Sequence, residues 1–477
     1  MRTPLSLCLC LGFFPGLFLA AADTPARPNV ILVMSDDQGW GDIGYNGHPL
    51  LQTPNLDAAA AAGLRLDSFY AAAPSCSPTR ASVLTGRHPN RMGVFSWGHA
   101  IRPQELTLAE VLREEGYMTG HFGKWHLGSV RVDSPVSPGK NGFDRWVSAK
   151  NFYDNNPTLS DEGMDIKLIG EGSQVAVESA LEWIREASRG EAPFLAVVWF
   201  GSPHYPHRAS EEDAALYQDQ PRNVRDFLGE VTGIDRAFGQ LREGISDLGL
   251  RENTLLWFTS DNGALRKVGS TGGYRGGKHS VYEGGIRVPA FIEWPRRIPV
   301  PFSSQVRAST VDIFPTVLEA AGVSLEGLPP LDGISLIPAM DRKMQERPTS
   351  IGFWNAHVPG KFDEPGKIIS RLLPTNQDWS DSKVDRVTKR VERLPRKERP
   401  LDAFPGHSAW ISGTWKLHRR EMQVVGRVSW ELYDLNADPA EKHDLAKAFP
   451  ARVAAMRLEL EDWLREVTRS LNGEDYR

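Results

Sequence analysis

Three short apolar segments stand out along the chain: VILVM (30–34), FLAVVWF (194–200) and TLLWF (254–258). Each is rich in β-branched or aromatic residues and lacks polar alternation, which is typical of strands covered on both faces. Segments with the apolar spacing of helices lie between them, at 54–62, 107–116, 173–188 and 223–249. This alternation predicts an α/β fold, with a large domain in which helices flank a mostly parallel central sheet.

A polar cluster follows each of the three predicted strands. The clusters are Ser35-Asp36-Asp37, Ser202-Pro203-His204 and Asp261-Asn262-Gly263. Taken singly, each is compatible with a turn or a helix cap, because Asp and Asn favour both. In open α/β sheets, however, ligands bind outside the carboxyl ends of the strands. The joint placement of the clusters therefore favours a single binding or catalytic site.

The pattern changes after about residue 340. Residues 376–400 carry eight basic and five acidic side chains without apolar periodicity, which predicts an exposed charged loop or insertion. Beyond it, 408–420 and 427–435 have the pattern of short antiparallel strands, and 450–471 has that of an amphipathic helix. We therefore expect a large domain over 23–340 and a smaller C-terminal α+β subdomain over 341–477.

The N-terminus has the pattern of a secretory signal peptide over residues 1–22. One arginine precedes a short apolar stretch that ends in Ala20-Ala21-Ala22. A membrane anchor is the alternative, but Pro15-Gly16 interrupts the stretch, which is also short for a bilayer span. No later segment approaches the ~20 uninterrupted apolar residues of a membrane helix. We expect an exported protein, periplasmic or secreted, with no membrane span after signal cleavage.

Composition narrows the choice of partner. The chain has 477 residues, of which 40% are hydrophobic and 24% charged, so it can bury a large core. Its formal net charge is -5, whereas nucleic-acid-binding proteins usually show a strong basic excess. We expect no nucleic-acid partner, and recognition of an anion must depend on local groups.

Cys76 is the one cysteine that remains after signal cleavage, because Cys8 and Cys10 lie inside the signal. It cannot form an internal disulfide, and the simplest interpretation is a small buried hydrophobic residue. The residues around Cys76 favour a functional role instead. Pro78 fits the first turn of a helix, which places Cys76 just ahead of that helix, where free backbone N–H groups attract an anion. Arg80 lies about one turn further on.

The segment CSPTRASVLTGR (76–87) resembles the sulfatase signature of the alkaline-phosphatase superfamily. Several further segments resemble motifs of the same family in the same order, and their sequences are RPNVILVMSDDQGWGD (27–42), GKWHLG (123–128), SPHYPH (202–207), FTSDNG (258–263), GGKHSVYEGGIRVP (276–289) and LYDLNADPAEKHDLA (432–446). The order is similar to that of arylsulfatases and N-acetylgalactosamine-6-sulfatase-like carbohydrate sulfatases. The resemblance implies an alkaline-phosphatase-like fold and a formylglycine-dependent sulfatase.

The resemblance also implies a metal site made of Asp36, Asp37, Asp261 and Asn262. These are hard oxygen ligands, which suit Ca²⁺ or Mg²⁺ better than zinc, and the family implies one Ca²⁺ per chain. Cys76 would be oxidised by a separate maturation enzyme to formylglycine (3-oxoalanine), whose oxygen completes the site. Helix capping is the alternative role for Asp36-Asp37.

Roles for the remaining residues follow from the same resemblance. The hydrated aldehyde presents two hydroxyls, of which one attacks sulfur and the other releases sulfate by restoring the aldehyde. A serine in its place would leave a stable sulfate ester. Arg80 and Lys124 would orient the formylglycine, and His126 would act as the base that collapses the diol. His204 and Lys278 would bind sulfate and supply a proton to the leaving oxygen.

Two other functions fit the motifs less well. A phosphonate or phosphate ester hydrolase can carry the same C-x-P-x-R centre. An inactive polyanion-binding homologue is disfavoured because no catalytic position is lost, although an unconverted Cys76 would leave only binding. We expect the substrate to be a sulfated carbohydrate rather than a small aryl or steroid sulfate. Aromatic residues of candidate pocket loops, among them Trp97, Trp146 and Tyr153, are candidates for stacking on sugar rings, although burial is equally compatible.

Overall fold

The computed structural model describes residues 27–356, 398–422 and 427–476. The expected signal peptide at 1–22 and residues 376–397 of the expected charged loop lie outside the described residues. No helix in the described part of the chain has both the length and the apolar character needed to cross a lipid bilayer.

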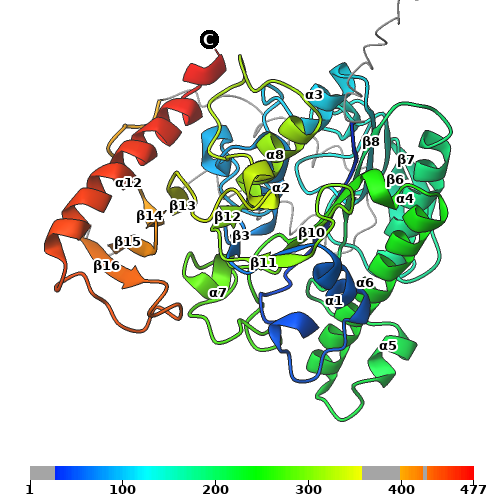
Figure 1. The fold of residues 1–477 in the computed structure, drawn as a ribbon, viewed down its shortest axis with the longest axis horizontal. Coiled ribbons are helices and arrows are strands. Elements are labelled where there is room, and N and C mark those ends of the chain that lie inside the picture. The colour runs from blue at the N-terminus through cyan, green and yellow to red at the C-terminus, as the bar shows by residue number, and fades with distance from the viewer. Residues whose placement is uncertain (1–26, 357–397, 423–426, 477) are drawn as a thin grey trace, which may run out of the picture.

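A ten-stranded sheet forms the centre of the large domain (Figure 1), in the order β11-β2-β10-β9-β1-β8-β4-β5-β6-β7. The strands are β1 (Asn29–Ser35), β2 (Leu64–Leu66), β4 (Met118–Lys124), β5 (Arg145–Ala149), β6 (Thr158–Asp161), β7 (Met164–Lys167), β8 (Phe194–Trp199), β9 (Thr254–Ser260), β10 (Phe291–Glu293) and β11 (Phe302–Ser304). The five central strands, from β9 to β5, run parallel, and antiparallel pairs extend the sheet at β10 and at β6–β7. The predicted mostly parallel sheet is confirmed.

Helices cover both faces of this sheet. One face holds α1 (Pro54–Ala62), α4 (Gly172–Ala187) and α6 (Arg222–Asp247), which form one apolar core with Ile31 and Val33 of β1. The other face holds α2 (Cys76–Thr85), α3 (Leu108–Glu114) and α8 (Ile313–Ala320), which form a second core with Val30, Leu32 and Met34. Successive side chains of a strand point to opposite faces, so an unbroken apolar strand serves both cores.

The parallel register brings the ends of the central strands level with one another. Ser35, the last residue of β1, pairs with Ser260, the last of β9, and Met34 pairs with Trp199 at the end of β8. The chain keeps this alignment just past the strands, where Asp261 N donates to Ser35 O at 3.2 Å and Asp36 N donates to Ser202 O at 2.9 Å. The polar clusters after the three strands therefore meet at one edge, as the sequence predicts.

A small C-terminal sheet lies at one end of the molecule with a long helix beside it (Figure 1). Its antiparallel strands, in spatial order, are β13 (Ile351–Ala356), β14 (Gly406–Ser412), β15 (Trp415–Met422) and β16 (Arg427–Asp434). The helix α12 (Pro450–Leu471) buries Leu460, Trp463 and Leu464 in a core shared with Trp354 of β13. The expected antiparallel strands and helix are confirmed, and β13 was not predicted.

Shorter elements connect these layers. The strands β3 (Phe69–Tyr70) and β12 (Ala308–Ser309) form a separate parallel pair, and the short helices are α5 (Glu211–Ala215), α7 (Glu283–Ile286) and α9 (Ile337–Met340). α7 follows the Gly-rich segment around Lys278 and leads into β10. In space it lies between the central sheet and the C-terminal sheet, and Glu283 N of α7 donates to Glu441 Oε2 (Figure 1).

Asp332 ties the segment after α2 to the C-terminal helix. Its carboxylate accepts hydrogen bonds from Arg91 Nε at 2.7 Å, from His88 N at 2.6 Å and from Trp463 Nε1 at 2.9 Å. Burial raises the pKa of Asp332, but the Arg91 guanidinium outweighs burial and holds that pKa below its usual range. The carboxylate is therefore ionised in the folded protein at neutral pH.

We expect Asp332→Asn to lower the free energy of unfolding at pH 7 by about 3 kcal/mol, because it leaves the buried Arg91 with only the exposed Glu466, 4.0 Å away, as a counter-charge. The folded-state pKa is depressed, so the carboxylate contributes stability above its unfolded pKa of about 3.9 and loses it as pH falls further. Urea unfolding at pH 7 and pH 3 measures both effects. A difference between variant and wild type that stays constant over this range would contradict the assignment.

Candidate active site

Cys76 is the first residue of α2, with Ser75 as an extended N-cap residue. The expectation that the helix begins near Pro78, with Cys76 just ahead of it, was slightly wrong, because the first turn already includes Cys76. Gly86 ends the helix in the left-handed conformation, as its lack of a Cβ allows. The first-turn backbone N–H groups lack helical partners, so the anion-attracting end of α2 is still at Cys76.

Cys76 is buried, with 1% of its surface exposed. Burial raises the pKa of its thiol, which disfavours the thiolate form that an ordinary cysteine nucleophile needs. Lys278 Nζ lies 3.7 Å from Cys76 Sγ. The side chain thus lies among charged groups, unlike a cysteine that only fills an apolar core.

Four acidic or amide side chains surround this position. Ligand atoms of Asp36, Asp37, Asp261 and Cys76 all lie within 4.8 Å of one another. Asp37 N donates to Asp261 Oδ1 at 3.0 Å, and Asn262 Nδ2 donates to Asp37 Oδ1 at 2.8 Å. The structure therefore brings together all the residues that the sequence proposes as metal ligands.

The donor set has the properties of a hard-cation site. Asp36 Oδ1 and Asn262 Oδ1 are buried, and neither has a hydrogen-bond partner among the described residues. Buried carbonyl and carboxylate oxygens without partners are costly unless a cation or water satisfies them. Oxygen ligands at this density fit Ca²⁺ or Mg²⁺, so the residues present fit the ion that the family implies.

Three cationic side chains contact the three carboxylates. Lys124 Nζ lies 2.5 Å from Asp36 Oδ2, and Lys278 Nζ lies 2.5 and 2.7 Å from the two oxygens of Asp37. Arg80 Nη2 lies 2.8 Å from Asp261 Oδ2. One cation for each carboxylate leaves the cluster near neutrality, so a divalent ion and a sulfate ester can enter together without a large net charge.

The two predicted lysines and Arg80 come from different elements. Lys124 is the last residue of β4, Arg80 lies in the second turn of α2, and Lys278 follows the Gly-rich loop after β9. Arg80 Nη1 also donates to the carbonyl oxygen of Lys124 at 3.2 Å. The guanidinium therefore links α2 to the end of β4 and is fixed at both of its terminal nitrogens.

The pKa values of the carboxyl groups diverge. Burial raises the pKa of Asp261 to about 7, and the neighbouring Asp36 adds to the rise. Burial also raises the pKa of Asp37, but Lys278 and His204 outweigh burial and hold it below its usual range. Burial lowers the pKa of Lys278, but Asp37, together with Cys76 and Asp36, outweighs burial and raises that pKa above its usual range. The pair Asp37–Lys278 is therefore charged on both sides.

His204 is placed at the cluster and His207 is not. His204 Nε2 lies 3.8 Å from Asp37 Oδ2, while its Nδ1 lies 2.6 Å from the carbonyl oxygen of Tyr205 and donates to it. His207 Nδ1 instead lies 3.0 Å from Glu230 Oε2, away from the carboxylates. The choice of His204 over His207 agrees with this placement.

His126 lies in a buried position after β4, with 4% of its surface exposed. Neither ring nitrogen has a hydrogen-bond partner among the described residues. Its backbone takes a φ of 55°, which is uncommon for a residue with a side chain and marks a constrained position. Burial lowers the pKa of both His126 and His204, the latter to about 3, so both rings are neutral in this arrangement.

Two aromatic contacts at the site were missed. The Phe152 ring stacks on His204 at 4.4 Å between centroids, and Arg80 lies 5.1 Å from the centroid of Trp199, the last residue of β8. The position of Trp199 at the end of a predicted strand could have indicated a site residue, whereas the sequence around Phe152 contains no such signal. The expected stacking candidates Trp146 and Tyr153 are buried, with 6% and 3% exposed, which excludes them as sugar platforms in this structure.

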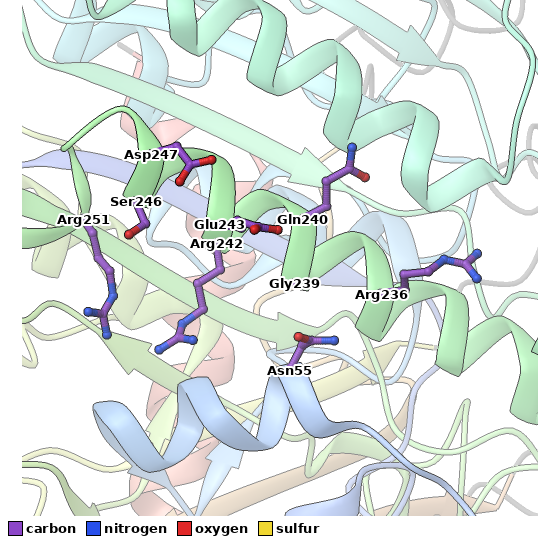
Figure 2. A pocket seen from close by; sticks show the side chains of 9 residues that line it. All are labelled: Asn55, Arg236, Gly239, Gln240, Arg242, Glu243, Ser246, Asp247 and Arg251. Carbon is purple, nitrogen blue, oxygen red and sulfur yellow. The ribbon is translucent and has the colours of Figure 1, made fainter.

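A surface cavity of about 720 Å³ lies elsewhere, between α1 and α6 (Figure 2). Its arginines are already paired, because Arg242 and Arg251 bond to Glu293 and Arg236 bonds to Asp213. Arg251 precedes β9, whereas Asp261 follows it, so the cavity lies toward the opposite edge of the sheet. It contains none of the predicted site residues.

Comparisons with known proteins identify the family of this chain. Residues 28–323 match the sulfatase family. The N-acetylgalactosamine-6-sulfatase of Canis lupus familiaris is 37% identical over 361 residues, covering 68% of this chain and 67% of its own. Homo sapiens arylsulfatase A is 32% identical over 472 residues, covering 90% of this chain and 85% of its own.

Solved structures extend the similarity to the whole fold. The structure of Ps i-CgsB in complex with k-i-k-neocarrahexaose is 25% identical and superposes with a TM-score of 0.74, covering 94% of this chain and 98% of that chain. The matched residues 28–323 include every predicted catalytic and metal-binding position. The chain therefore belongs to the sulfatase family and is a sulfuric ester hydrolase.

Proposed function

We propose that this protein removes sulfate from a sulfated carbohydrate, with a formylglycine derived from Cys76 and one Ca²⁺ held by Asp36, Asp37, Asp261 and Asn262. The observation that carries the proposal is the buried cluster in which Cys76 lies within 4.8 Å of three carboxylates. Carbohydrate substrates are supported by the relatives, one of which is an N-acetylgalactosamine-6-sulfatase.

Asp36, Asp37, Asp261 and Asn262 would hold Ca²⁺, which would neutralise charge on the sulfate oxygens, and residue 76 as hydrated formylglycine would supply the attacking hydroxyl. The chain's own residues hold this centre in place. Arg80 fixes Asp261 and the end of β4, and Lys124 fixes Asp36. Because sulfuryl transfer has a loose transition state, its rate depends mainly on positioning and charge neutralisation, which these ion pairs provide.

One lysine is placed to bind the sulfate group, and two histidines are placed to transfer protons. Lys278 Nζ lies beside both Asp37 and Cys76 Sγ, where it can contact a sulfate oxygen without moving far. His204 Nε2 is directed at the cluster because Nδ1 donates to Tyr205 O and keeps the one proton of the neutral ring. Nε2 would protonate the leaving oxygen after the ring takes up a second proton, which the negative charge of a bound sulfate ester favours. The ring nitrogens of His126 have no competing partner among the described residues and can accept a proton from residue 76.

We expect His204→Ala to reduce turnover more strongly for a sugar sulfate than for 4-nitrophenyl sulfate. A sugar alkoxide is a poor leaving group that needs a proton, whereas 4-nitrophenolate leaves without one, and a general acid contributes about 10²–10⁴-fold. Steady-state kcat on both substrates measures the ratio, and His207→Ala serves as the matched control. Equal losses on the two substrates would assign His204 to binding alone.

The proposed chemistry is tested by competing assays. Purified protein is given an aryl sulfate, an aryl phosphonate and a panel of sulfated oligosaccharides of known linkage. We expect the highest kcat/KM on a sulfated oligosaccharide and a lower value on the phosphonate. A higher kcat/KM on the phosphonate would instead identify a phosphonate ester hydrolase, and no turnover of any sulfate would indicate an inactive binding protein.

We also propose export, with cleavage after Ala22, and maturation of Cys76 by a formylglycine-generating enzyme. The support is the signal-like segment over residues 1–22 and the single remaining cysteine. N-terminal sequencing of protein from the periplasm or medium tests it. A mature chain that begins at Asp23 is expected, and retention of Met1 would contradict export by this signal.

A further inference from the structure

The loop that carries Lys278 is packed against the short helix α7. Lys278 N donates to Ala264 O at 2.9 Å, and Gly284 N donates to Arg275 O at 2.7 Å. Gly285 lies so close to the loop that a Cβ there would be 2.0 Å from Ser280 O and 2.4 Å from Gly277 O. These two carbonyls flank Lys278 in sequence, so a shift of α7 must shift the backbone on both sides of the lysine.

The same helix contacts the residue that follows Asn262. Gly263 N donates to Gly285 O at 3.0 Å, and a Cβ on Gly263 would lie 2.2 Å from Gly284 O. The backbone of Gly263 is therefore in direct contact with the backbone of α7. The position of α7 therefore determines where both Lys278 and Asn262 lie.

The first residue of α7, Glu283, is held by the C-terminal subdomain. Lys416 Nζ of β15 lies 2.8 Å from Glu283 Oε1 and 3.1 Å from Glu441 Oε1. Glu441 Oε2 in turn accepts a hydrogen bond from Glu283 N at 2.7 Å. All three side chains are fully buried. Glu283 and Glu441 belong to two motifs that are 158 residues apart, and only the folded chain joins them.

The surrounding groups complete this buried network. His418 Nε2 lies 2.6 Å from Glu441 Oε1, and Glu283 Oε2 accepts from Tyr70 OH at 3.0 Å and from Arg287 Nη1 at 3.3 Å. Buried ion pairs recover their desolvation cost only with good geometry and further hydrogen bonds, and in some proteins they specify one arrangement more than they add stability.

A second, independent contact reaches the residue next to Lys278. Asn355 Nδ2 of β13 donates to His279 O at 2.9 Å, and His279 N donates to Pro74 O at 2.9 Å, two residues before Cys76. Further along the loop, Tyr282 OH donates to Glu431 Oε2 of β16 at 2.6 Å. Three strands of the C-terminal sheet thus hold the loop.

We infer that Lys416 and Glu441 of the C-terminal subdomain are positioning residues for the reaction, which act through Glu283 and α7 to fix Lys278 in the sulfate site. The inference rests on the proposed role of Lys278. Lys416 touches neither the carboxylate cluster nor Cys76, so its contribution passes through the backbone contacts of α7.

A double-mutant cycle tests the inference. Lys416→Met removes the charge and keeps the chain length, and we expect it to lower kcat on an aryl sulfate by about tenfold. In the Lys278→Ala background the same change should alter kcat by less than about twofold, because residues that act as one unit are non-additive. An equal loss in both backgrounds would overturn the inference, since a general structural defect is independent of Lys278. Lys447→Met, at an exposed lysine of the same subdomain, is the matched control and should leave kcat unchanged.

A milder variant covers the possibility that Lys416→Met fails to fold. Asn355→Ala removes one hydrogen bond at a half-buried position, and we expect it to lower kcat by about threefold with a loss that again disappears beside Lys278→Ala. Inorganic sulfate gives a readout apart from activity. Its stabilisation of the wild type against heat should shrink in both Lys416→Met and Asn355→Ala, and an unchanged sulfate effect in Asn355→Ala would overturn the inference.

The outcomes separate this inference from the proposed function. If Lys278→Ala alone leaves kcat unchanged, the proposed role of Lys278 is wrong and the positioning role falls with it. If Lys278→Ala lowers kcat while Lys416→Met and Asn355→Ala do not, the proposed function stands and only the positioning role is wrong.

Discussion

Replacing Cys76 with alanine should abolish turnover, with kcat/KM on 4-nitrophenyl sulfate reduced by about 10⁵-fold or more. Loss of a covalent nucleophile typically lowers the rate by about this factor, and no other residue of the described cluster occupies the position of the nucleophile at the start of α2. The fold should survive, because Cys76→Ala removes a single sulfur atom from one buried turn. Thermal unfolding checks the fold in the same preparation.

Cys76→Ser is the informative control. Produced without conversion of the serine, it should form one covalent sulfate ester per chain and stop, since serine has no second hydroxyl to release sulfate. Intact-protein mass spectrometry after incubation with substrate detects the adduct. Activity of Cys76→Ala within about tenfold of the wild type would refute the assigned nucleophile.

The identity of residue 76 can be read directly from the wild type. The tryptic peptide 66–80 contains it, and an aldehyde there should react with hydroxylamine and resist thiol alkylation. A free thiol in active enzyme would rule out formylglycine.

Removing the divalent ion should have the second-largest effect. We expect a Ca²⁺ chelator to abolish hydrolysis and lower the unfolding temperature, with both restored by Ca²⁺. Binding to the folded state stabilises it by about 2.7 kcal/mol when Ca²⁺ is present at 100 times its Kd. Asp36 Oδ1 and Asn262 Oδ1, which have no hydrogen-bond partner among the described residues, provide the reason.

Asp37→Asn should weaken Ca²⁺ binding by at least about 100-fold, since even the outer-shell partners of a metal contribute about 10–100-fold. Asparagine is chosen because Asp37 has a φ of 75°, a conformation that Asn tolerates and Ala does not. Calorimetric titration with Ca²⁺ measures the change, and Asp341→Asn, remote from the cluster, is the control. Stronger stabilisation by Zn²⁺ than by Ca²⁺ would contradict the assigned ion.

The apolar pattern predicted the elements that are buried on both faces or strongly amphipathic. β1, β8 and β9 coincide with the three apolar segments to within a few residues, and α12 spans the predicted 450–471. These elements are local in origin, because each contains enough apolar surface to be recognised from its own spacing.

β4 was missed although it is a central strand that ends at Lys124. Its sequence, MTGHFGK, is interrupted by Gly120, His121 and Gly123. Neighbouring elements crowd both glycines, since a Cβ on Gly123 would lie 1.9 Å from Trp199 O of β8 and one on Gly120 would lie 3.0 Å from the Trp183 ring of α4. Close packing against neighbouring elements thus requires glycine at these positions, and the glycines interrupt the apolar pattern by which a strand is recognised in the sequence.

The site could be assembled from the sequence only through the resemblance and the rule for strand ends. Spacing alone placed Arg80 beside Cys76, and the strand-end rule placed Asp36-Asp37 near Asp261-Asn262. The ion pairs of Lys124 with Asp36 and of Lys278 with Asp37 join residues 88 and 241 positions apart. No local pattern encodes those pairs.

By itself, the sequence determined the kinds of groups available: one cysteine after residue 22, hard oxygen groups after two strands, and strands apolar enough to form the central sheet. The tertiary structure decided their charges and their partners. Burial and neighbouring charges set the pKa values of Asp37, Asp261 and Cys76, and those depend on distances that exist only in the folded chain. The tertiary structure also showed that Lys416 of the C-terminal sheet forms an ion pair with Glu283. A buried charge needs a counter-charge, and only folding brings these two residues together.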